Sequence, residues 1–368
     1  MKRLGLGLIG SGFMGMTHSF GFATAQKVFD LPYDIDFAMV ADVTPDLAEA
    51  ARKRFGFRRC TSDWRALVTD PEVDVVDITA PNAFHKDMAL AAIAAGKHVY
   101  CEKPLAPLAS DAQEMRDAAE AAGICTQVGF NYICNPMVGQ ARAMIQAGEL
   151  GEIYSYRGIH AEDYMADPSA PWTWRHDPQG GGAMADLGSH ALATAEFLLG
   201  PIAEVFGQCR TVIPSRPGSD GATAVEVDDV ANVMLRFASG VTGTIEANWV
   251  ATGRKMQHDF EVYGSKGSLF LTQERLNELW FCDASDARGR GGMRRILAGP
   301  DQPPYGNFCI APGHQLGFND LKAIEIKGYL DAIAGRSPEP FGFRAGHRIQ
   351  SMVETVHKSS DQQCWLAV

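Results

Sequence analysis

The sequence predicts the α/β fold class: a doubly wound parallel sheet, followed by an α+β domain with a large, mostly antiparallel sheet. Three observations support this. A glycine-rich turn follows the first apolar run, strand and helix patterns alternate up to about residue 128, and closely spaced strand patterns dominate from about residue 151. The chain has 368 residues, of which 46% are hydrophobic, so it can bury two cores. We expect the domains to be residues 1–128 and 129–368.

The first domain should build its sheet from short apolar runs separated by helical stretches. The expected strands are 4–9, 35–41, 73–79, 98–101 and 125–130, and the expected helices include 86–95 and 110–122. Apolar-rich runs of this kind are typical of parallel strands, which helices cover on both faces. The alternation of strand and helix therefore predicts a doubly wound parallel sheet.

The second domain shows strands that lie close together along the chain. The expected strands are 153–160, 204–210, 231–237, 243–249, 259–263 and 268–272. Turn signals such as Ser239-Gly240 separate them, which favours antiparallel pairing in one large sheet. The helix Ala183–Leu199, which Gly200-Pro201 ends, should lie on this sheet. Residues 283–304 should form an exposed excursion, and 321–334 and 348–358 should be closing helices.

A glycine motif near the N-terminus fits a bound dinucleotide. Gly10, Gly12 and Gly15 form G-x-G-x-x-G directly after the first strand, with Phe13 and Met14 before the last glycine. In such a turn the first glycine makes the bend, the second admits a pyrophosphate, and the third allows close packing of helix on strand. The N–H groups that begin the following helix then face the phosphates. A Rossmann cofactor domain is therefore predicted.

Asp42 ends the second predicted strand, where such folds place an acid that binds the ribose hydroxyls. Its charge would repel a 2′-phosphate and no arginine directly follows it, so NAD is favoured over NADP. The gap from Gly15 exceeds the usual spacing of roughly 20 residues, because an extra loop precedes the strand. The alternative is that Asp42 caps the helix that begins near Pro45.

Glu102-Lys103-Pro104 follows the predicted strand His98–Cys101. The carboxyl end of a parallel strand is where open α/β sheets bind ligands. The proline restrains the lysine backbone to an extended conformation and so aims its side chain. The alternative is a surface turn with a salt bridge.

Asp186 and His190 lie four residues apart on the predicted helix, after the cluster Gly180-Gly181-Gly182. A carboxylate that orients an imidazole forms half of an acid/base pair. The glycines allow backbone to approach a ligand closely. The alternative is a structural pair inside the helix.

Together these motifs resemble the Gfo/Idh/MocA oxidoreductases, a family that includes glucose-fructose oxidoreductase and inositol 2-dehydrogenase. The segments that carry the resemblance are the glycine motif, Thr79-Ala80-Pro81-Asn82 with His85, Gly96–Val99 with Glu102-Lys103-Pro104, and the Asp186/His190 motif. Three further segments are most similar to the levoglucosan and L-glucose/scyllo-inositol dehydrogenase branch: Gly129–Tyr132, Arg157-Gly158 and Trp174-Arg175.

The resemblance implies NAD-dependent oxidation of a secondary hydroxyl on a sugar or cyclic polyol. His190 would accept the hydroxyl proton, Asp186 would orient the imidazole, and Lys103 would donate a hydrogen bond to the substrate oxygen. The residues expected to bind the cofactor are Gly10, Gly12, Phe13, Met14, Asp42, Ala80, Pro81, Asn82, His85, Glu102, Lys103, Asn131, Trp174 and Arg175. The residues expected to bind the substrate are Lys103, Tyr132, His160, Glu162, Trp174, Arg175, Asp186, His190 and His314.

Several of these assignments compete with plainer ones. The aromatic residues that could stack on a sugar are Tyr132, Tyr164, Trp172 and Trp174. Aromatic side chains are also ordinary core residues, and Trp249 is expected to be one. His160 and Glu162 alternate along a strand, so they could bind substrate hydroxyls or lie at a solvated edge. His314 could line the pocket or be an ordinary loop residue.

Composition narrows the partners. A net charge of −11 argues against nucleic acid or anionic membrane, and no apolar run reaches the roughly 20 residues that span a bilayer. The eight cysteines form no C-x-x-C pair and H-E-x-x-H is absent, so no metal site is expected. Without a signal-peptide pattern, a cytoplasmic protein with reduced thiols is expected. The exposed face of the antiparallel sheet suggests a homo-oligomer, either a dimer or a tetramer.

Two other functions remain open. The same fold serves NAD-dependent glycosidases, in which the hydride is borrowed and returned, and cofactor-binding regulators that have lost catalysis. Net NADH production would exclude the glycosidase as the main activity. The joint presence of Lys103, Asp186 and His190 favours an enzyme over a regulator.

Overall fold

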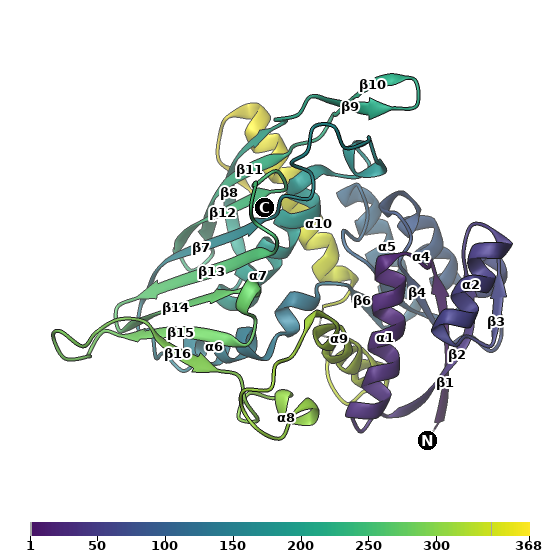
Figure 1. Ribbon diagram of the computed structural model, residues 1–368, viewed down its shortest axis with the longest axis horizontal. Coiled ribbons are helices and arrows are strands. Elements are labelled where there is room, and N and C mark those ends of the chain that lie inside the picture. The colour runs from purple at the N-terminus through teal and green to yellow at the C-terminus, as the bar shows by residue number, and fades with distance from the viewer. Residues whose placement is uncertain (1, 340) are drawn as a thin grey trace. The chain divides into compact units, whose positions relative to one another are not determined.

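The computed structural model describes residues 2–339 and 341–368, which form two compact units. One unit combines the chain up to Cys134 with Gly317–Gln350, and the other combines Asn135–Leu316 with Ser351–Val368. Figure 1 shows the helices and strands of both units. Each unit therefore contains a segment from late in the chain as well as its main segment.

The first unit contains a six-stranded sheet in which every neighbouring pair is parallel. The strand order is β3 (Arg59–Thr61), β2 (Tyr33–Ala41), β1 (Lys2–Ile9), β4 (Val75–Ile78), β5 (His98–Cys101) and β6 (Thr126–Val128). The order reverses between β1 and β4, which is the switch point where doubly wound sheets bind ligands. The predicted doubly wound sheet is confirmed. The short edge strand β3 was not predicted, because three half-buried residues carry no apolar pattern.

Helices of the first unit pack in two groups, as a doubly wound sheet requires. The helices are α1 (Phe13–Val28), α2 (Pro45–Phe55), α3 (Trp64–Val68), α4 (His85–Ala94), α5 (Ala109–Ala122) and α9 (Phe318–Ile333), with short 3₁₀ turns η1 (Asn82–Phe84) and η2 (Asn131–Cys134). Helix α1 contacts α2 and α9, whereas α4 contacts α3 and α5. Figure 1 shows α9, from late in the chain, lying beside α1. A helix from the C-terminal third thus completes the N-terminal fold.

The second unit contains a nine-stranded sheet that is antiparallel except for one parallel pair, β7 with β12. The order is β16 (Arg294–Leu297), β15 (Glu278–Asp283), β14 (Gly267–Thr272), β13 (Gln257–Gly264), β7 (Ile153–Ala161), β12 (Thr242–Asn248), β11 (Val230–Phe237), β8 (Ile202–Arg210) and β17 (Leu366–Ala367). Strictly alternating burial along β11 marks a sheet with one covered face. The predicted large, mostly antiparallel sheet is confirmed.

Two expectations for this unit need correction. Residues 283–304 are largely exposed, as expected, but they are not irregular throughout, because β16 in this segment pairs with β15. The Gly- and Arg-rich composition concealed this four-residue strand. Two strands, β9 (Ser215–Gly218) and β10 (Gly221–Ala224), form a separate hairpin that was also not predicted.

Helices cover one face of the large sheet. They are α6 (Pro136–Gln146), a π-helix (Met184–Gly188) and α7 (Ser189–Leu199). The unit also contains the short α8 (Tyr305–Phe308) and 3₁₀ turns at Trp174–His176 and Gln273–Arg275. Helix α7 contacts β7 and β12, as expected of a helix that lies on the sheet. The predicted helix 183–199 therefore exists, but its first turn is wound as a π-helix. The last helix, α10 (Phe343–Gln362), starts in the first unit and ends in the second.

Within the described residues, no helix has the length and apolar character needed to cross a membrane. All eight cysteines lie in this described part of the chain and are free thiols.

Candidate active site

The glycine turn has the packing that its motif predicts. Gly10 has a positive φ of 96°, and a Cβ on Gly15 would lie 2.2 Å from the Gly10 carbonyl oxygen, so neither position accepts a larger residue. The Thr79 hydroxyl, which follows β4, donates to that same carbonyl at 2.8 Å. A Cβ on Gly12, in contrast, would meet nothing within 4 Å. The turn is thus tight where helix meets strand and open where a phosphate would approach.

Asp42 is bonded to the glycine turn. Its Oδ2 accepts hydrogen bonds from the Ser11 N–H at 2.9 Å and from the Ser11 hydroxyl, and its Oδ1 accepts from the Val43 N–H at 2.7 Å. The alternative that Asp42 caps α2 is wrong, because Thr44 is the N-cap and accepts from the Leu47 N–H. The carboxylate therefore lies beside the phosphate turn, as a ribose-binding acid would.

The segments after β4 and β5 are joined by His85. This buried imidazole contacts the Ala80 carbonyl through Nε2 at 2.8 Å and the Pro104 carbonyl through Nδ1 at 3.0 Å. Pro81 is exposed, whereas Asn82 is buried at the start of η1. His85 was predicted to bind the cofactor, and the structure places it behind the two loops, where it fixes their spacing.

Aromatic residues line up beside the glycine turn. Phe13 is 65% exposed and stacks on Phe318 at 6.1 Å between ring centroids, and Tyr132 lies 6.0 Å from the same ring. Phe318 begins α9 and was not predicted from sequence. Asn131 is buried, and among the described residues its Nδ2 has no hydrogen-bond partner. Met14, also predicted here, is half-buried in the first turn of α1.

Glu102 is not the acid of a surface salt bridge, as the alternative reading of Glu102-Lys103-Pro104 would require. It is 5% exposed, and its Oε1 contacts His18 Nε2 at 2.8 Å and Lys322 Nζ at 3.0 Å. Its Oε2 accepts from the Lys103 backbone N–H at 3.2 Å. Lys103 itself is half-buried, and its peptide bond to Pro104 is cis. The carboxylate thus holds the lysine by its backbone.

Further buried charges surround Glu102. His18 Nδ1 contacts Asp77 at 2.8 Å, and Lys322 Nζ lies 2.7 Å from Glu325. Burial raises the pKa of Glu102, but Lys322 and His18 outweigh this and lower it well below its usual range. Burial likewise lowers the pKa of His18, and the contact with Asp77 raises it overall. His18 therefore bridges the carboxylates of Asp77 and Glu102, and Lys322 bridges those of Glu102 and Glu325.

Asp186 lies in the π-helix of the second unit and is held by two neighbours. The Tyr164 hydroxyl donates to Asp186 Oδ2 at 2.6 Å, and Arg175 Nε lies 3.5 Å from the same oxygen. The Arg175 guanidinium also lies over the Trp174 ring, 4.5 Å from its centroid. The predicted residues Trp174, Arg175 and Asp186 are thus brought together, with Tyr164 added.

His190 begins α7 and belongs to a group of three imidazoles. It is 5% exposed, and its ring centroid lies 5.6 Å from that of His160 and 6.3 Å from that of His258. His160 contacts the Leu187 carbonyl at 3.1 Å and Glu162 at 3.1 Å. Burial and the neighbouring His160 lower the pKa of His258 well below its usual value. His160 and Glu162 are therefore bonded to each other beside the helix that carries the predicted base.

Among the described residues, no group of three or more His, Cys, Asp or Glu side chains is placed so that it could hold a metal ion.

Other predicted residues lie elsewhere. Trp249 is fully buried, as expected, and donates through Nε1 to Asp229. Trp172 donates from its indole to the Ala224 carbonyl at 3.2 Å, so it packs on the β9–β10 hairpin. His314 lies in an exposed loop, where its carbonyl accepts a hydrogen bond from Tyr305.

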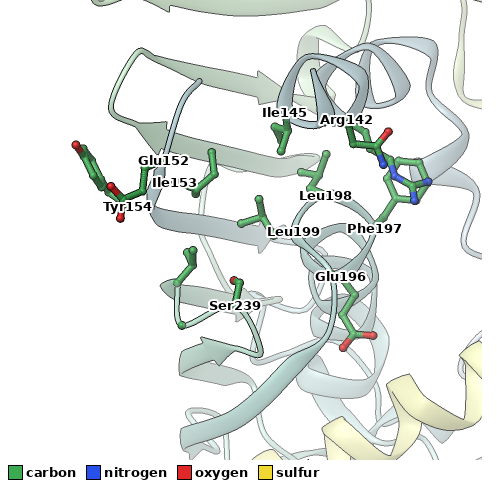
Figure 2. Close-up of a pocket in the computed structure, with 14 residues that line it drawn as sticks. Arg142, Ile145, Glu152, Ile153, Tyr154, Glu196, Phe197, Leu198, Leu199 and Ser239 are labelled. Atoms are coloured by element: carbon green, nitrogen blue, oxygen red, sulfur yellow. The ribbon is translucent and has the colours of Figure 1, made fainter. Parts of the chain in front are cut away.

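A pocket of about 780 Å³ opens in the second unit, and none of the predicted site residues lines it. Figure 2 shows that Arg142 and Ile145 from α6 line it together with Leu198 and Leu199 from the end of α7. His190 lies nine residues before Leu199, which is roughly 13 Å along a helix. The pocket is therefore at the opposite end of α7 from the predicted base.

Sequence reasoning missed several residues that support the site. No local motif marks His18, Asp77 or Lys322. A polar residue within an apolar strand or helix can indicate a buried hydrogen-bonded group, and this was the available signal. Arg216 is 1% exposed and donates to the carbonyls of Met165 and Asp167, which fixes the loop after Tyr164.

Comparison with known proteins now identifies the family. A family model described as an oxidoreductase family with an NAD-binding Rossmann fold matches residues 4–130, and one described as the GFO/IDH/MocA C-terminal domain matches residues 138–270. Levoglucosan dehydrogenase of Pseudarthrobacter phenanthrenivorans is 37% identical over 100% of this chain and 99% of its own length. The chain belongs to the Gfo/Idh/MocA oxidoreductase family.

Other Gfo/Idh/MocA proteins extend the comparison. The scyllo-inositol 2-dehydrogenase (NAD(+)) of Bacillus subtilis is 26% identical over 90% of this chain and 86% of its own. A solved structure of levoglucosan dehydrogenase in complex with NADH and levoglucosan superposes with a TM-score of 0.96 at 37% identity, covering 100% of both chains. The family predicted from the motifs, its enzyme class and its NAD-binding Rossmann domain are confirmed.

The first unit of this Gfo/Idh/MocA chain fits NAD. The space in front of Gly12 is open, and the N-cap of α1 carries no side-chain hydrogen bond that would occupy the first N–H groups. Asp42 supplies an acceptor beside the turn.

Replacing Asp42 by alanine should weaken NAD binding and shift the preference toward NADP by about 10-fold or more, because a charged acceptor for the ribose is lost and a 2′-phosphate is no longer repelled. Fluorescence titration with both cofactors measures the ratio of dissociation constants. Asp46→Ala is the matched control, since it removes the same charge from the exposed first turn of α2. An unchanged ratio in Asp42→Ala, or a wild type that already prefers NADP, contradicts this interpretation.

Replacing Lys322 by methionine should lower the free energy of unfolding of the first unit by about 3–5 kcal/mol, because Glu102 and Glu325 would lose a fully buried cation. Urea denaturation measures the change. Lys327→Met is the control on the same helix, where the half-exposed ammonium pairs with Asp331 and a loss of about 1 kcal/mol or less is expected. Equal losses of unfolding free energy in the two variants would show that the buried ion pairs of Lys322 stabilise the fold no more than an exposed pair does.

Proposed function

We propose that this protein is an NAD-dependent dehydrogenase that oxidises a secondary hydroxyl of a pyranose-like sugar or cyclic polyol. The observation that carries the proposal is the full-length similarity, at a TM-score of 0.96, to an enzyme solved with NADH and levoglucosan. The relative named for scyllo-inositol points to the same substrate class, a ring with neighbouring secondary hydroxyls. Levoglucosan and the inositols are therefore the first substrates to test.

The proposed roles follow the residues predicted from sequence. When bound, NAD supplies the hydride acceptor, and the glycine turn, Asp42 and the loops after β4 and β5 would hold it. His190 would accept the hydroxyl proton, and Asp186 would orient the His190 imidazole. The hydrogen bond from the Tyr164 hydroxyl would hold the Asp186 carboxylate in place. Lys103 would donate to the substrate oxygen, where negative charge develops as the proton leaves.

Specificity is assigned to the polar and aromatic residues around Asp186. A polyol carries many hydroxyls, and each needs a partner once water is removed. Glu162 and Arg175 offer an acceptor and a donor of this kind, and Trp174 offers an apolar ring face that a sugar could cover. We keep His160, Tyr132 and His314 as further candidates for substrate contacts.

We also propose residues 1–128 as the cofactor domain and 129–368 as the domain for substrate binding and oligomerisation, in a cytoplasmic homo-oligomer. Helix α9 and the start of α10 are exceptions, because residues 317–350 pack in the first unit. Exposed apolar residues on strands of the large sheet, such as Tyr154 and Met234, support an interface on this sheet. Light scattering measures the oligomeric state, and a monomer at micromolar concentration would contradict it.

The alternative of an NAD-dependent glycosidase predicts no net change in the cofactor. Following NADH absorbance with levoglucosan, scyllo-inositol and myo-inositol separates the two directly. Sugar-dependent NADH formation supports the dehydrogenase. Cleavage of glycosides without net NADH would replace it.

His190→Ala should lower kcat by about 10² to 10⁴, because a general base is lost. Asp186→Asn should leave the fold intact and lower kcat by misorienting the imidazole. Turnover and the midpoint of thermal unfolding are measured on the same samples, with turnover read well below that midpoint. A histidine that only fills the core would behave differently, with a lowered midpoint but turnover within a few fold of wild type.

Lys103→Ala should lower kcat by a factor of at least about 10² while NAD binding persists, because the lost donor acts mainly in the transition state. Lys86→Ala is the matched control, since that lysine pairs with Asp111 and Glu114 at the surface of the same unit. A folded Lys103→Ala enzyme with near-normal kcat would remove this residue from the mechanism.

A further inference from the structure

Two adjacent carboxylates, Asp228 and Asp229, lie directly before β11 and have no role in the chemistry proposed above. They are 7% and 0% exposed. Burying an ionised carboxylate is costly unless hydrogen bonds or cations compensate. The partners of this pair therefore indicate why the fold keeps two acids in its interior.

Asp228 receives the first N–H groups of the helix that carries Asp186. Its Oδ2 accepts from the Met184 N–H at 2.8 Å, and its backbone carbonyl accepts from the Ala183 N–H at 2.9 Å. Gly182 has a φ of 70°, and a Cβ there would lie 2.5 Å from Asp228 Oδ1. The turn that contains Gly182 thus packs against this carboxylate, and a negative charge at a helix N-terminus is favourable.

His357 holds the other oxygen of Asp228. Its Nε2 lies 3.0 Å from Asp228 Oδ1, on the part of α10 that belongs to the second unit. Burial lowers the pKa of His357, but hydrogen bonds with Asp228 and Cys209 outweigh it and raise this pKa to about 10. The carboxylate therefore has a cation on one side and the start of the π-helix on the other.

Asp229 reaches Asp186 by a second route. Its Oδ1 accepts from the Trp249 indole at 2.6 Å, and its Oδ2 accepts from the N–H groups of Val212 and Ile213. The Trp249 ring meets the Tyr164 ring edge-on at 6.3 Å between centroids. The Tyr164 hydroxyl then donates to Asp186 at 2.6 Å.

We propose that Asp228, held by His357, and Asp229, acting through Trp249, are positioning residues that set the backbone and the carboxylate of Asp186. One acid fixes where the π-helix starts, and the other fixes the ring that bonds to the Asp186 side chain. Neither is assigned a contact with substrate or cofactor. The inference rests on the proposed function, since Asp186 is taken there to orient the base, and small misplacements of a catalytic group lower the rate by up to about 10²-fold.

A matched pair of variants at His357 tests the first route. His357→Leu removes the donor to Asp228, whereas His357→Gln retains an N–H donor without the charge. We expect kcat for the sugar to fall about 10- to 100-fold in His357→Leu and to recover most of this loss in His357→Gln. The dissociation constant for NAD should stay within about twofold, because the residues proposed to hold its phosphates and ribose are in the other unit. Lys358→Leu, a neighbouring surface position, is the control and should match wild type.

Trp249→Phe tests the second route, because phenylalanine keeps an apolar ring but cannot donate to Asp229. It should lower kcat in the same range as His357→Leu. The decisive comparison adds each variant to Asp186→Asn. In that background, His357→Leu and Trp249→Phe should each lower kcat by a further factor of less than about three. The effects are not additive, because residues that act through Asp186 have little left to lose once its carboxylate is gone.

Each outcome decides between positioning and mere support. Variants that lower the midpoint of unfolding yet leave kcat within about twofold, read well below that midpoint, overturn the inference. The inference is also overturned if the factors by which kcat falls multiply in full in the Asp186→Asn background, because the residues would then act independently of Asp186. A wild type that forms no NADH with any polyol overturns the proposed function and this inference with it. That result is obtained before any variant is compared.

Discussion

Buried charge that must find a partner is the constraint on which both units depend. In the first unit, Glu102 lies in the interior at the end of β5 and is compensated by His18 and Lys322. These partners come from α1 and from α9, which returns to the first unit late in the chain. Breaking one member of such a network costs far more than an exposed pair would, because the remaining charge stays buried. The same network holds Lys103 through its backbone N–H.

The second unit also contains buried carboxylates that need partners. Asp228 and Asp229 are compensated by backbone N–H groups, an indole and His357, and their partners surround the segment that carries Asp186. Buried polar groups whose hydrogen bonds are all satisfied rigidify a structure and specify one arrangement of it. Under the proposed function, residues that do not contact the substrate would thus determine how well Asp186 is placed.

Local features of the sequence predicted much of this. The glycine turn, the parallel strands and the alternating antiparallel strands follow from spacing within short windows, and the positions of Lys103, Asp186 and His190 follow from motifs. The partners of Glu102 could not be predicted in this way, because Lys322 is separated from it by 220 residues. The same is true of Asp228, which lies 44 residues from the Met184 N–H that it accepts. The periodicity of a sequence describes neighbours within a few residues, so it cannot predict contacts at such separations.

The π-helix at Met184–Gly188 shows how a non-local contact changes a local structure. The sequence of this segment suits an ordinary α-helix, and the predicted i, i+4 relation of Asp186 and His190 assumes one. Its start, however, is fixed by Asp228 against a glycine turn, while α7 is fixed by packing on β7 and β12. An extra residue in one turn accommodates both constraints, and π-turns of this kind often occur at functional sites. The geometry of the proposed base is therefore set by the fold around the helix as much as by the helix itself.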